Sequence, residues 1–188
     1  IKALLGTQIG FDLPEVVQRL VSPIDRTEKY LLGLDDAQTV ESVLLYHMDR
    51  ITACLSTQVG CALKCAFCAT GKGGFVRNLS CAEIIGQVLV MERPPGSGGS
   101  ESAQKIGNIV FMGMGEPLLN YEEVKQAIRI LTDPKQFGIS KRRITVSTAG
   151  VVPGIERLGT EILEGASFLT GITLSVSLHA PNNRLRDF

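Results

Sequence analysis

The chain has 188 residues, of which 44% are hydrophobic and 20% charged, as expected of a globular protein with one real core. Basic and acidic residues number 19 each, so the formal net charge is zero and the basic excess typical of dedicated nucleic-acid binders is absent. No apolar run approaches the roughly 20 residues that cross a bilayer, and no secretory signal is visible. Local basic patches such as Lys141-Arg142-Arg143 and the pair Lys72 and Arg77 remain, although solvated basic surfaces explain them equally well.

The first third of the chain is rich in strand-forming residues. We expect a short helix over Leu13–Leu20, between two prolines, and little other regular structure before residue 29. Glu41–Tyr46 and Ile51–Val59 are the best strands there, because β-branched and apolar residues dominate both. Residues 29–59 thus form a β-rich segment that precedes the rest of the core.

From Ile51 onward, strands alternate with helices. The helix over Cys81–Met91 has an apolar face, and Ser80 and Glu83 form a capping box at its start. A flexible Pro/Gly/Ser loop follows over residues 93–105. The later elements are a strand over Asn108–Met112, a helix over Tyr121–Leu131, a strand over Arg143–Ser147, a helix over Gly154–Leu163 and a strand over Gly171–Leu178. This alternation predicts right-handed βαβ units and a parallel sheet with four strand-and-loop units, the last without its helix.

Unusual sequences follow each of the four strands. In parallel βα architectures, ligands gather at the carboxyl ends of the strands, so these loops should meet at one site. In chain order they are Cys61–Gly74, Gly113-Met-Gly-Glu-Pro117, Ser147-Thr-Ala-Gly150 and Ser177-Leu-His-Ala-Pro-Asn182.

Five cysteines are present, an odd number, and three of them lie within eight residues, unlike the cysteines of a disulfide framework. Cys61, Cys65 and Cys68 have the spacing C-x3-C-x2-C, which suits three corners of a [4Fe–4S] cubane. The fourth iron would then be open to an amine and a carboxylate, both offered by the methionyl end of S-adenosylmethionine (SAM). Phe67 could shield the cluster or contact the nucleoside. Reduced thiolates indicate an intracellular protein.

Zinc is the alternative metal that these thiolates could bind. It needs four ligands, commonly from paired knuckles. The other candidates have no paired spacing; they are Cys54, Cys81, His47 and His179. The sequence therefore favours the cluster.

Four motifs resemble the RlmN/Cfr family of radical SAM rRNA and tRNA methyltransferases, from about Tyr30 to the end. They begin with the run Cys54-Leu-Ser-Thr-Gln-Val-Gly-Cys61-Ala-Leu-Lys-Cys65-Ala-Phe-Cys68 and its continuation to Leu79. The others are Phe111–Asn120, Lys141–Pro153 and Ser177–Asn182. The resemblance implies an α/β fold, a partial (β/α)6 radical SAM barrel truncated after about the fourth strand, with a [4Fe–4S] cluster and SAM as cofactors.

The resemblance also assigns cofactor-binding residues. Gly115 and Glu116 match the motif that binds the SAM amino group, and Ser147 matches a residue at the ribose or carboxylate. Ser177, Leu178 and His179 match the stretch that contacts the adenosyl group. From the residues alone, a glycine turn, a helix N-cap at Ser147 and a structural histidine stay open as alternatives.

Two catalytic roles follow from the same resemblance. Cys54 matches the cysteine that resolves a protein–RNA adduct by forming a disulfide, and Glu41 matches the proton acceptor. A buried strand thiol and an exposed strand carboxylate are the structural alternatives. Cys81 matches no family role and is expected to be a helix-start residue.

The implied activity is methylation of an adenine ring carbon, C2 rather than C8, in 23S rRNA or tRNA through a methylcysteine. The implied partners are RNA and an external electron donor such as flavodoxin or ferredoxin, with no membrane, in the cytoplasm or an organelle. The methyl-carrying cysteine lies beyond Phe188 in the family. We therefore expect a fragment that cannot complete methylation alone, with residues 1–28 a remnant of an N-terminal RNA-binding domain or linker and 29–188 the incomplete core. A radical SAM enzyme with a non-RNA substrate, or a non-catalytic metal-binding module, are the alternatives.

Overall fold

The computed structural model describes residues 13–48, 50–92 and 105–178, together with 180, 182 and 184. The strands of the main sheet are β1 (Glu15–Val21), β2 (Glu28–Gly33), β3 (Thr39–His47), β4 (Arg50–Cys54), β7 (Asn108–Phe111), β8 (Ile144–Thr148) and β9 (Thr173–Val176). The order of these seven strands is β1-β2-β3-β4-β7-β8-β9. The main helices are α3 (Cys81–Glu92), α4 (Tyr121–Thr132) and α5 (Val152–Leu163), with 3-10 turns η2 (Pro117–Leu119) and η3 (Lys141–Arg143).

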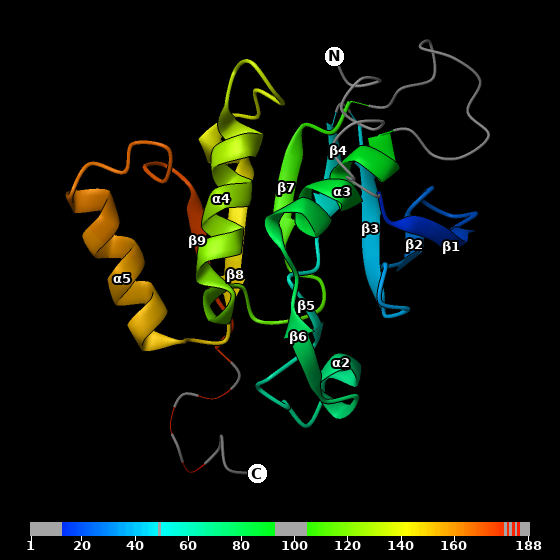
Figure 1. Ribbon diagram of the computed structural model, residues 1–188, viewed down its shortest axis with the longest axis horizontal. Helices are drawn as coiled ribbons and strands as arrows, with labels where there is room; N and C mark the ends of the chain where they lie inside the picture. The colour runs from blue at the N-terminus through cyan, green and yellow to red at the C-terminus, as the bar shows by residue number, and fades with distance from the viewer. Residues whose placement is uncertain are drawn as a thin grey trace.

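The sheet has an antiparallel half and a parallel half that share β4. Strands β1 to β4 pair antiparallel, whereas β4, β7, β8 and β9 pair parallel. Helices α3, α4 and α5 connect the parallel strands. Because right-handed crossovers that advance in one direction along a sheet place their helices on the same face, these helices cover one side (Figure 1). The expected mixed α/β fold with a parallel sheet and a partial barrel is confirmed.

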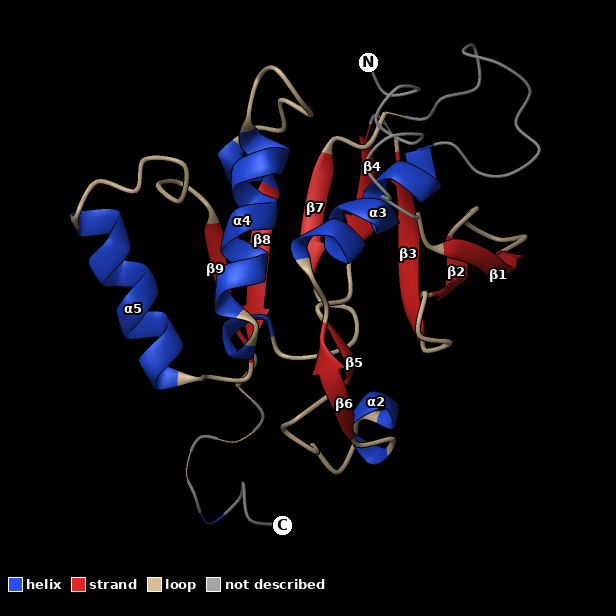
Figure 2. Cartoon of the chain, viewed as in Figure 1, coloured by secondary structure: helices blue, strands red, loops and turns tan. Residues whose placement is uncertain are grey.

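A second, two-stranded sheet lies at one end of the main sheet. It consists of β5 (Gln58–Gly60) and β6 (Phe75–Asn78), which pair antiparallel, and it carries the short helix α2 (Ala69–Lys72). The hairpin extends beyond the ends of β4 and β7 (Figure 2). It therefore projects from the edge of the main sheet at which the parallel strands end.

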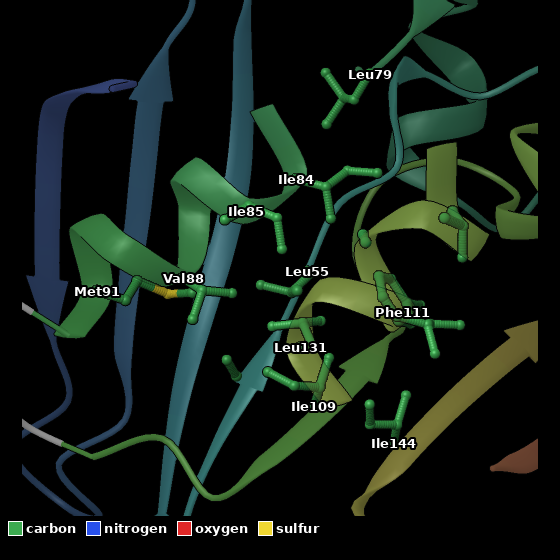
Figure 3. Close-up of a cluster of buried hydrophobic side chains, with 14 of the residues drawn as sticks. Leu55, Leu79, Ile84, Ile85, Val88, Met91, Ile109, Phe111, Leu131 and Ile144 are labelled. Atoms are coloured by element: carbon green, nitrogen blue, oxygen red, sulfur yellow. The ribbon is translucent and has the colours of Figure 1, made fainter. Parts of the chain in front are cut away.

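Alternate residues of each parallel strand face the helices. Ile109 is paired in register with Ala53 on one side, and Phe111 with Val146 on the other. All of these side chains are at most 2% exposed. Ile109, Phe111 and Val146 belong to one buried cluster with Ile84, Val88 and Leu131 of α3 and α4; Figure 3 shows Ile109 and Phe111 beside these helix residues. We call this the covered face and the opposite one the open face. The strands thus bury one apolar row because their side chains alternate with a period of two.

One predicted element is wrong. The helix expected over Leu13–Leu20 is replaced by β1, which pairs with β2 from Glu15↔Gly33 to Val21↔Glu28 around a bulge near Val16. An isolated helix of that length is marginal in water. The edge of β2 offers the same backbone a ladder of hydrogen bonds, which the valines of this segment favour.

A second expectation was only half correct. The strand predicted over Ile51–Val59 is two strands, β4 and β5, because the chain leaves the main sheet after Cys54. Leu55 N–H still donates to Val110 O at 2.9 Å, and Ser56 and Thr57 are buried in the connection. The remaining predicted strands and helices are present with ends shifted by a few residues, and all but the last residue of the 93–105 loop lies outside the described residues.

The capping box predicted at the start of α3 is confirmed. Ser80 N–H donates to Glu83 Oε2 at 2.8 Å, and Glu83 N–H donates to Ser80 Oγ at 3.2 Å. Within the described part of the chain, no helix has both the length and the apolar character needed to span a membrane.

Candidate active site

The cysteine loop connects β5 to β6 and is closed by two glycines. Gly60 has φ +74°, and a Cβ there would lie 1.9 Å from Gly74 O, so no side chain fits. Cys61 N–H donates to Gly74 O at 2.9 Å. The loop therefore begins and ends at one closed point of the hairpin.

The three predicted ligands lie on this loop. Cys61 is buried, Cys65 and Cys68 are half-buried, and Cys68 N–H donates to Cys65 O at 3.0 Å. Burial raises the pKa of the Cys61 thiol, and a hydrogen bond from Leu63 N–H lowers it by less. The thiols of Cys65 and Cys68 and the carboxylate of Glu116 raise this pKa further. These groups are therefore close enough to interact electrostatically.

Three thiols on one short loop are a donor set that a cubane cluster accepts. All five cysteines are free thiols. Among the described residues, no three His, Cys, Asp or Glu side chains converge as the ligands of one metal ion would. The thiolates of a cubane each bind a different iron, so three separate thiols on one short loop suit a cluster with an open fourth corner.

The second loop, residues 113–117, passes directly beside β5. A Cβ on Gly113 would lie 2.7 Å from Leu55 O, and one on Gly115, which has φ +98°, would lie 2.5 Å from Gln58 Cβ. Both positions therefore require glycine, as a close approach of two backbones demands.

Glu116 is 3% exposed, and its carboxylate accepts hydrogen bonds from main-chain N–H groups. Oε1 accepts from Leu118 N–H at 3.1 Å, and Oε2 accepts from Ala149 N–H in the loop after β8 at 2.9 Å. These two bonds leave about half of the acceptor positions of a carboxylate. Glu116 thus joins two of the predicted site loops and keeps capacity for a further donor.

Three predicted site residues share the open face. Cys54 is opposite Val43 on β3 and Val110 on β7, and Ser147 is opposite Ser175. Glu41 is two residues before Val43, so strand alternation places it on the same face. The structure thus brings Glu41, Cys54 and Ser147 to one side of the sheet.

The environments of Glu41 and Cys54 differ. The Glu41 carboxylate lies 2.6 Å from Lys29 Nζ, with both side chains nearly half exposed. Burial raises the pKa of the Cys54 thiol, although a hydrogen bond from Met112 N–H opposes this shift. Cys54 is thus mainly a neutral thiol at pH 7.

The fourth loop is only partly described. Ser177 N–H donates to Thr148 O at 2.8 Å, which keeps it beside the loop after β8. Leu178 is 73% exposed, and His179 lies outside the described residues. The convergence of Ser177 with the third loop is therefore present, whereas the role of His179 stays a prediction.

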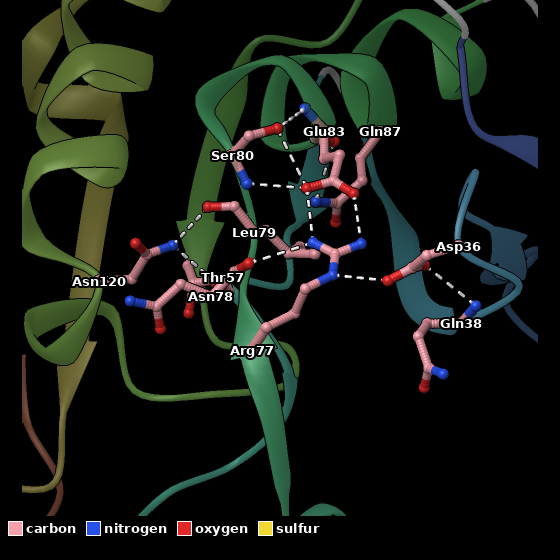
Figure 4. Close-up of polar contacts among 10 residues, drawn as sticks. All are labelled: Asp36, Gln38, Thr57, Arg77, Asn78, Leu79, Ser80, Glu83, Gln87 and Asn120. Carbon is pink, nitrogen blue, oxygen red and sulfur yellow. Dashed lines mark hydrogen bonds and ion pairs between the residues drawn. The ribbon is translucent and has the colours of Figure 1, made fainter.

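Arg77 on β6 fixes the hairpin to the body of the protein. Its guanidinium contacts Asp36 Oδ2 at 2.7 Å and Glu83 at 2.7 and 2.9 Å (Figure 4). Two acidic partners neutralise this arginine. Of the basic pair expected at Lys72 and Arg77, the positive charge of Arg77 is therefore balanced within the protein.

Sequence reasoning missed a set of amide side chains around these loops. Gln58, Asn78 and Asn120 bond between the hairpin and residues 113–120. A signal was available at Gln58, a polar residue in a predicted apolar strand.

Comparison with known proteins agrees with this geometry. The sequence profile of the radical SAM superfamily matches residues 55–188, and the chain belongs to that superfamily. The resemblance to RlmN-type proteins is also confirmed. The probable dual-specificity RNA methyltransferase RlmN of Fervidobacterium nodosum is 50% identical over 175 residues, 93% of this chain and 46% of that protein. That of Thermotoga maritima is 50% identical over 186 residues, 99% of this chain and 50% of that protein.

A solved structure is similar over the same extent. The crystal structure of a radical SAM methyltransferase from Sphaerobacter thermophilus has a TM-score of 0.84 and 41% identity, covering 99% of this chain and 51% of that one. The chain spans about half the length of the curated relatives it matches.

Proposed function

We propose that this chain carries the cluster- and SAM-binding part of a radical SAM RNA methyltransferase of the RlmN type. One observation carries the proposal: the glycine turn at residues 113–117 packs against β5, the strand that leads into the three-cysteine loop, at the edge of the sheet where the parallel strands end. That arrangement joins a three-thiol loop to a glycine turn. Identity of about 50% to probable RlmN proteins supports the choice of reaction.

The loops divide the binding work. Cys61, Cys65 and Cys68 would hold a [4Fe–4S] cluster, which supplies the electron for reductive cleavage of SAM when bound. Gly115 and Glu116 would hold the SAM amino group, since a carboxylate accepts strongly from an ammonium. Ser147 would bind the ribose or carboxylate. Ser177, Leu178 and His179 would contact the adenosyl group.

The open face would supply the later steps. The target is an sp² carbon of adenine, C2 rather than C8, and the methyl group reaches it from a methylated protein cysteine. Glu41 would accept the proton that leaves the ring carbon, and Lys29 would hold its carboxylate in place. Cys54, once deprotonated, would attack the sulfur that links protein and RNA; a disulfide forms, the carbon–sulfur bond breaks, and the carbon keeps the electron pair and takes up a proton to become the methyl group.

The test uses the complete protein, reconstituted anaerobically with iron and sulfide. With SAM, an external one-electron donor such as flavodoxin, and unmodified 23S rRNA or tRNA, we expect 2-methyladenosine by mass spectrometry of the nucleosides. Cys65→Ala should abolish both the cluster absorption and the product. Release of 5′-deoxyadenosine without methylated RNA would refute the RNA substrate. An unchanged cluster in Cys65→Ala would refute the ligand assignment.

A further inference from the structure

Gln58 connects the cysteine hairpin to the glycine turn with both ends of its amide. Its Oε1 accepts from Glu116 N–H at 3.0 Å, and its Nε2 donates to Asn78 Oδ1 on β6 at 2.8 Å. The side chain is 1% exposed, so both bonds are shielded from water. An amide carries a donor and an acceptor on one planar group, which suits this bridging position.

The backbone of Gln58 contacts the same turn. Gln58 N–H donates to Met114 O at 3.2 Å, and Gly115 has no room for a side chain because Gln58 occupies that space. Two adjacent residues therefore hold the turn against Gln58: Met114 by a main-chain hydrogen bond and Gly115 by close packing.

Further bonds extend this contact to the neighbouring loops. Asn120 Nδ2 donates to Thr57 O and Leu79 O, both at 2.8 Å, and so links the segment after the turn to the residues that flank the hairpin on both sides. Glu116, whose N–H Gln58 holds, accepts from Ala149 N–H with its carboxylate. A continuous set of bonds thus runs from β6 through Gln58 and Glu116 to the loop after β8.

We propose that Gln58 is a positioning residue that sets the place of bound SAM relative to the cluster. This inference rests on the proposed function, because the hairpin would carry the iron ligands and the turn would carry the SAM amino group. If the amide is lost, the two loops still fold, but their separation is no longer fixed to a fraction of an ångström. SAM, which has to reach both loops at once, then binds less tightly.

The closing experiment compares two buried glutamines in the complete protein, reconstituted anaerobically. Gln58→Met removes both bonds at nearly constant volume. Gln87→Met is the matched control: Gln87 is 0% exposed and bonds to Ser42 and Ser56 rather than to the turn itself, which it reaches only through the bond from Met114 N–H to Ser56 Oγ. The measurements are iron content, thermal unfolding, SAM affinity, and the change that SAM causes in the EPR spectrum of the reduced cluster.

We expect Gln58→Met to keep its iron, to bind SAM about tenfold more weakly and to lose the EPR change at SAM concentrations that saturate the unmodified protein. Gln87→Met should lower thermal stability and leave SAM affinity unchanged. Equal losses of SAM affinity in both variants, or unchanged affinity in Gln58→Met, would overturn the inference. An unmodified protein that assembles no cluster would instead overturn the proposed function, and the inference with it.

Asn78 provides a second route if Gln58→Met does not fold, because its side chain is exposed. Asn78→Leu removes the acceptor for Gln58 Nε2 and should weaken SAM binding at unchanged iron content. Asn78→Asp keeps an acceptor oxygen and should retain most of the affinity. The same affinity in these two variants would contradict the positioning role.

Discussion

The covered and open faces of the main sheet are formed by alternate residues of the same strands, yet they differ in chemistry. Ile109 and Val110 are neighbours on β7; the first is fully buried under the helices and the second is half-buried on the open face. The covered face collects aliphatic side chains, whereas the open face carries Cys54, Ser147 and Glu41. Stability and chemistry are thus assigned to residues one position apart, because strand side chains alternate.

The largest expected effect tests the covered face. Ile109→Ala should lower the free energy of unfolding by about 2–5 kcal/mol, because it removes buried methyl groups and leaves a cavity among packed side chains. Chemical denaturation followed by circular dichroism measures this loss.

Val110→Ala is the matched change on the open face. It should cost about 1 kcal/mol or less, since its side chain has fewer neighbours to lose. Similar losses in the two variants would mean that the open face is packed as tightly as the covered one, and the contrast between the faces would fail.

A smaller effect on the free energy of unfolding is expected at Glu28, a charged side chain on the otherwise mainly apolar covered face. Glu28 is 5% exposed and accepts hydrogen bonds from Arg19, Tyr30 and Tyr46. Arg19→Met should cost about 1–3 kcal/mol at pH 7, at the low end because Arg19 is 35% exposed and partly screened by water. Arg142→Met, at an exposed arginine, should change stability by no more than about 0.5 kcal/mol.

The same carboxylate predicts a pH dependence. Burial opposes ionisation of Glu28, but the bonds from Arg19 and the two tyrosines outweigh it, so its pKa is lowered. A lowered folded-state pKa gives stability that is present above the unfolded value, about 4.3, and is lost as pH falls through the folded value. Arg19→Met should lose less stability than the unmodified chain over this acidic range. Parallel pH profiles of unfolding would show that Arg19 does not lower the pKa of Glu28.

The smallest effect on stability is expected at Cys54. Cys54→Ser keeps an acceptor for Met112 N–H and should change the free energy of unfolding by about 0.5 kcal/mol or less. The thiol should be alkylated slowly at pH 7, and the rate should continue to rise above about pH 8.5, because burial raises its pKa. Peptide mass spectrometry of iodoacetamide-treated protein gives the rate, with a free cysteine peptide as reference. A plateau at or below the pH of that peptide's plateau would contradict the raised pKa.

Much of the fold could be predicted from the sequence. The strand–helix alternation after Ile51 and the capping box at Ser80 are local patterns, and both are present in the structure. The β1 segment was not predictable in the same way, because its conformation depends on the edge of β2, which is distant in sequence. The division of the Ile51–Val59 run depends likewise on Met114, which is distant in sequence and whose carbonyl oxygen accepts from Thr57 N–H and Gln58 N–H where the chain has left β4.

The candidate site was predictable in its composition and less so in its contacts. Spacing alone selected Cys61, Cys65 and Cys68, whereas Cys54 followed only from the family resemblance, and its place on the open face came from the structure. Periodicity says nothing of which main-chain groups a buried carboxylate will bind, so the bond from Ala149 to Glu116 could not be foreseen. The polarity of Gln58 within an apolar strand signalled a buried polar contact, but not that its partners are Glu116 and Asn78.

The closure of the cysteine loop at Gly60 and Gly74 has a consequence for protein engineering. The two ends of residues 61–73 meet where Gly60 and Cys61 contact Gly74. We therefore expect that loops of different length from relatives can replace residues 61–73 without changing the pairing of β5 with β6, provided that both glycines are kept. A larger residue at Gly60 would clash with Gly74 O and separate the two ends of the loop.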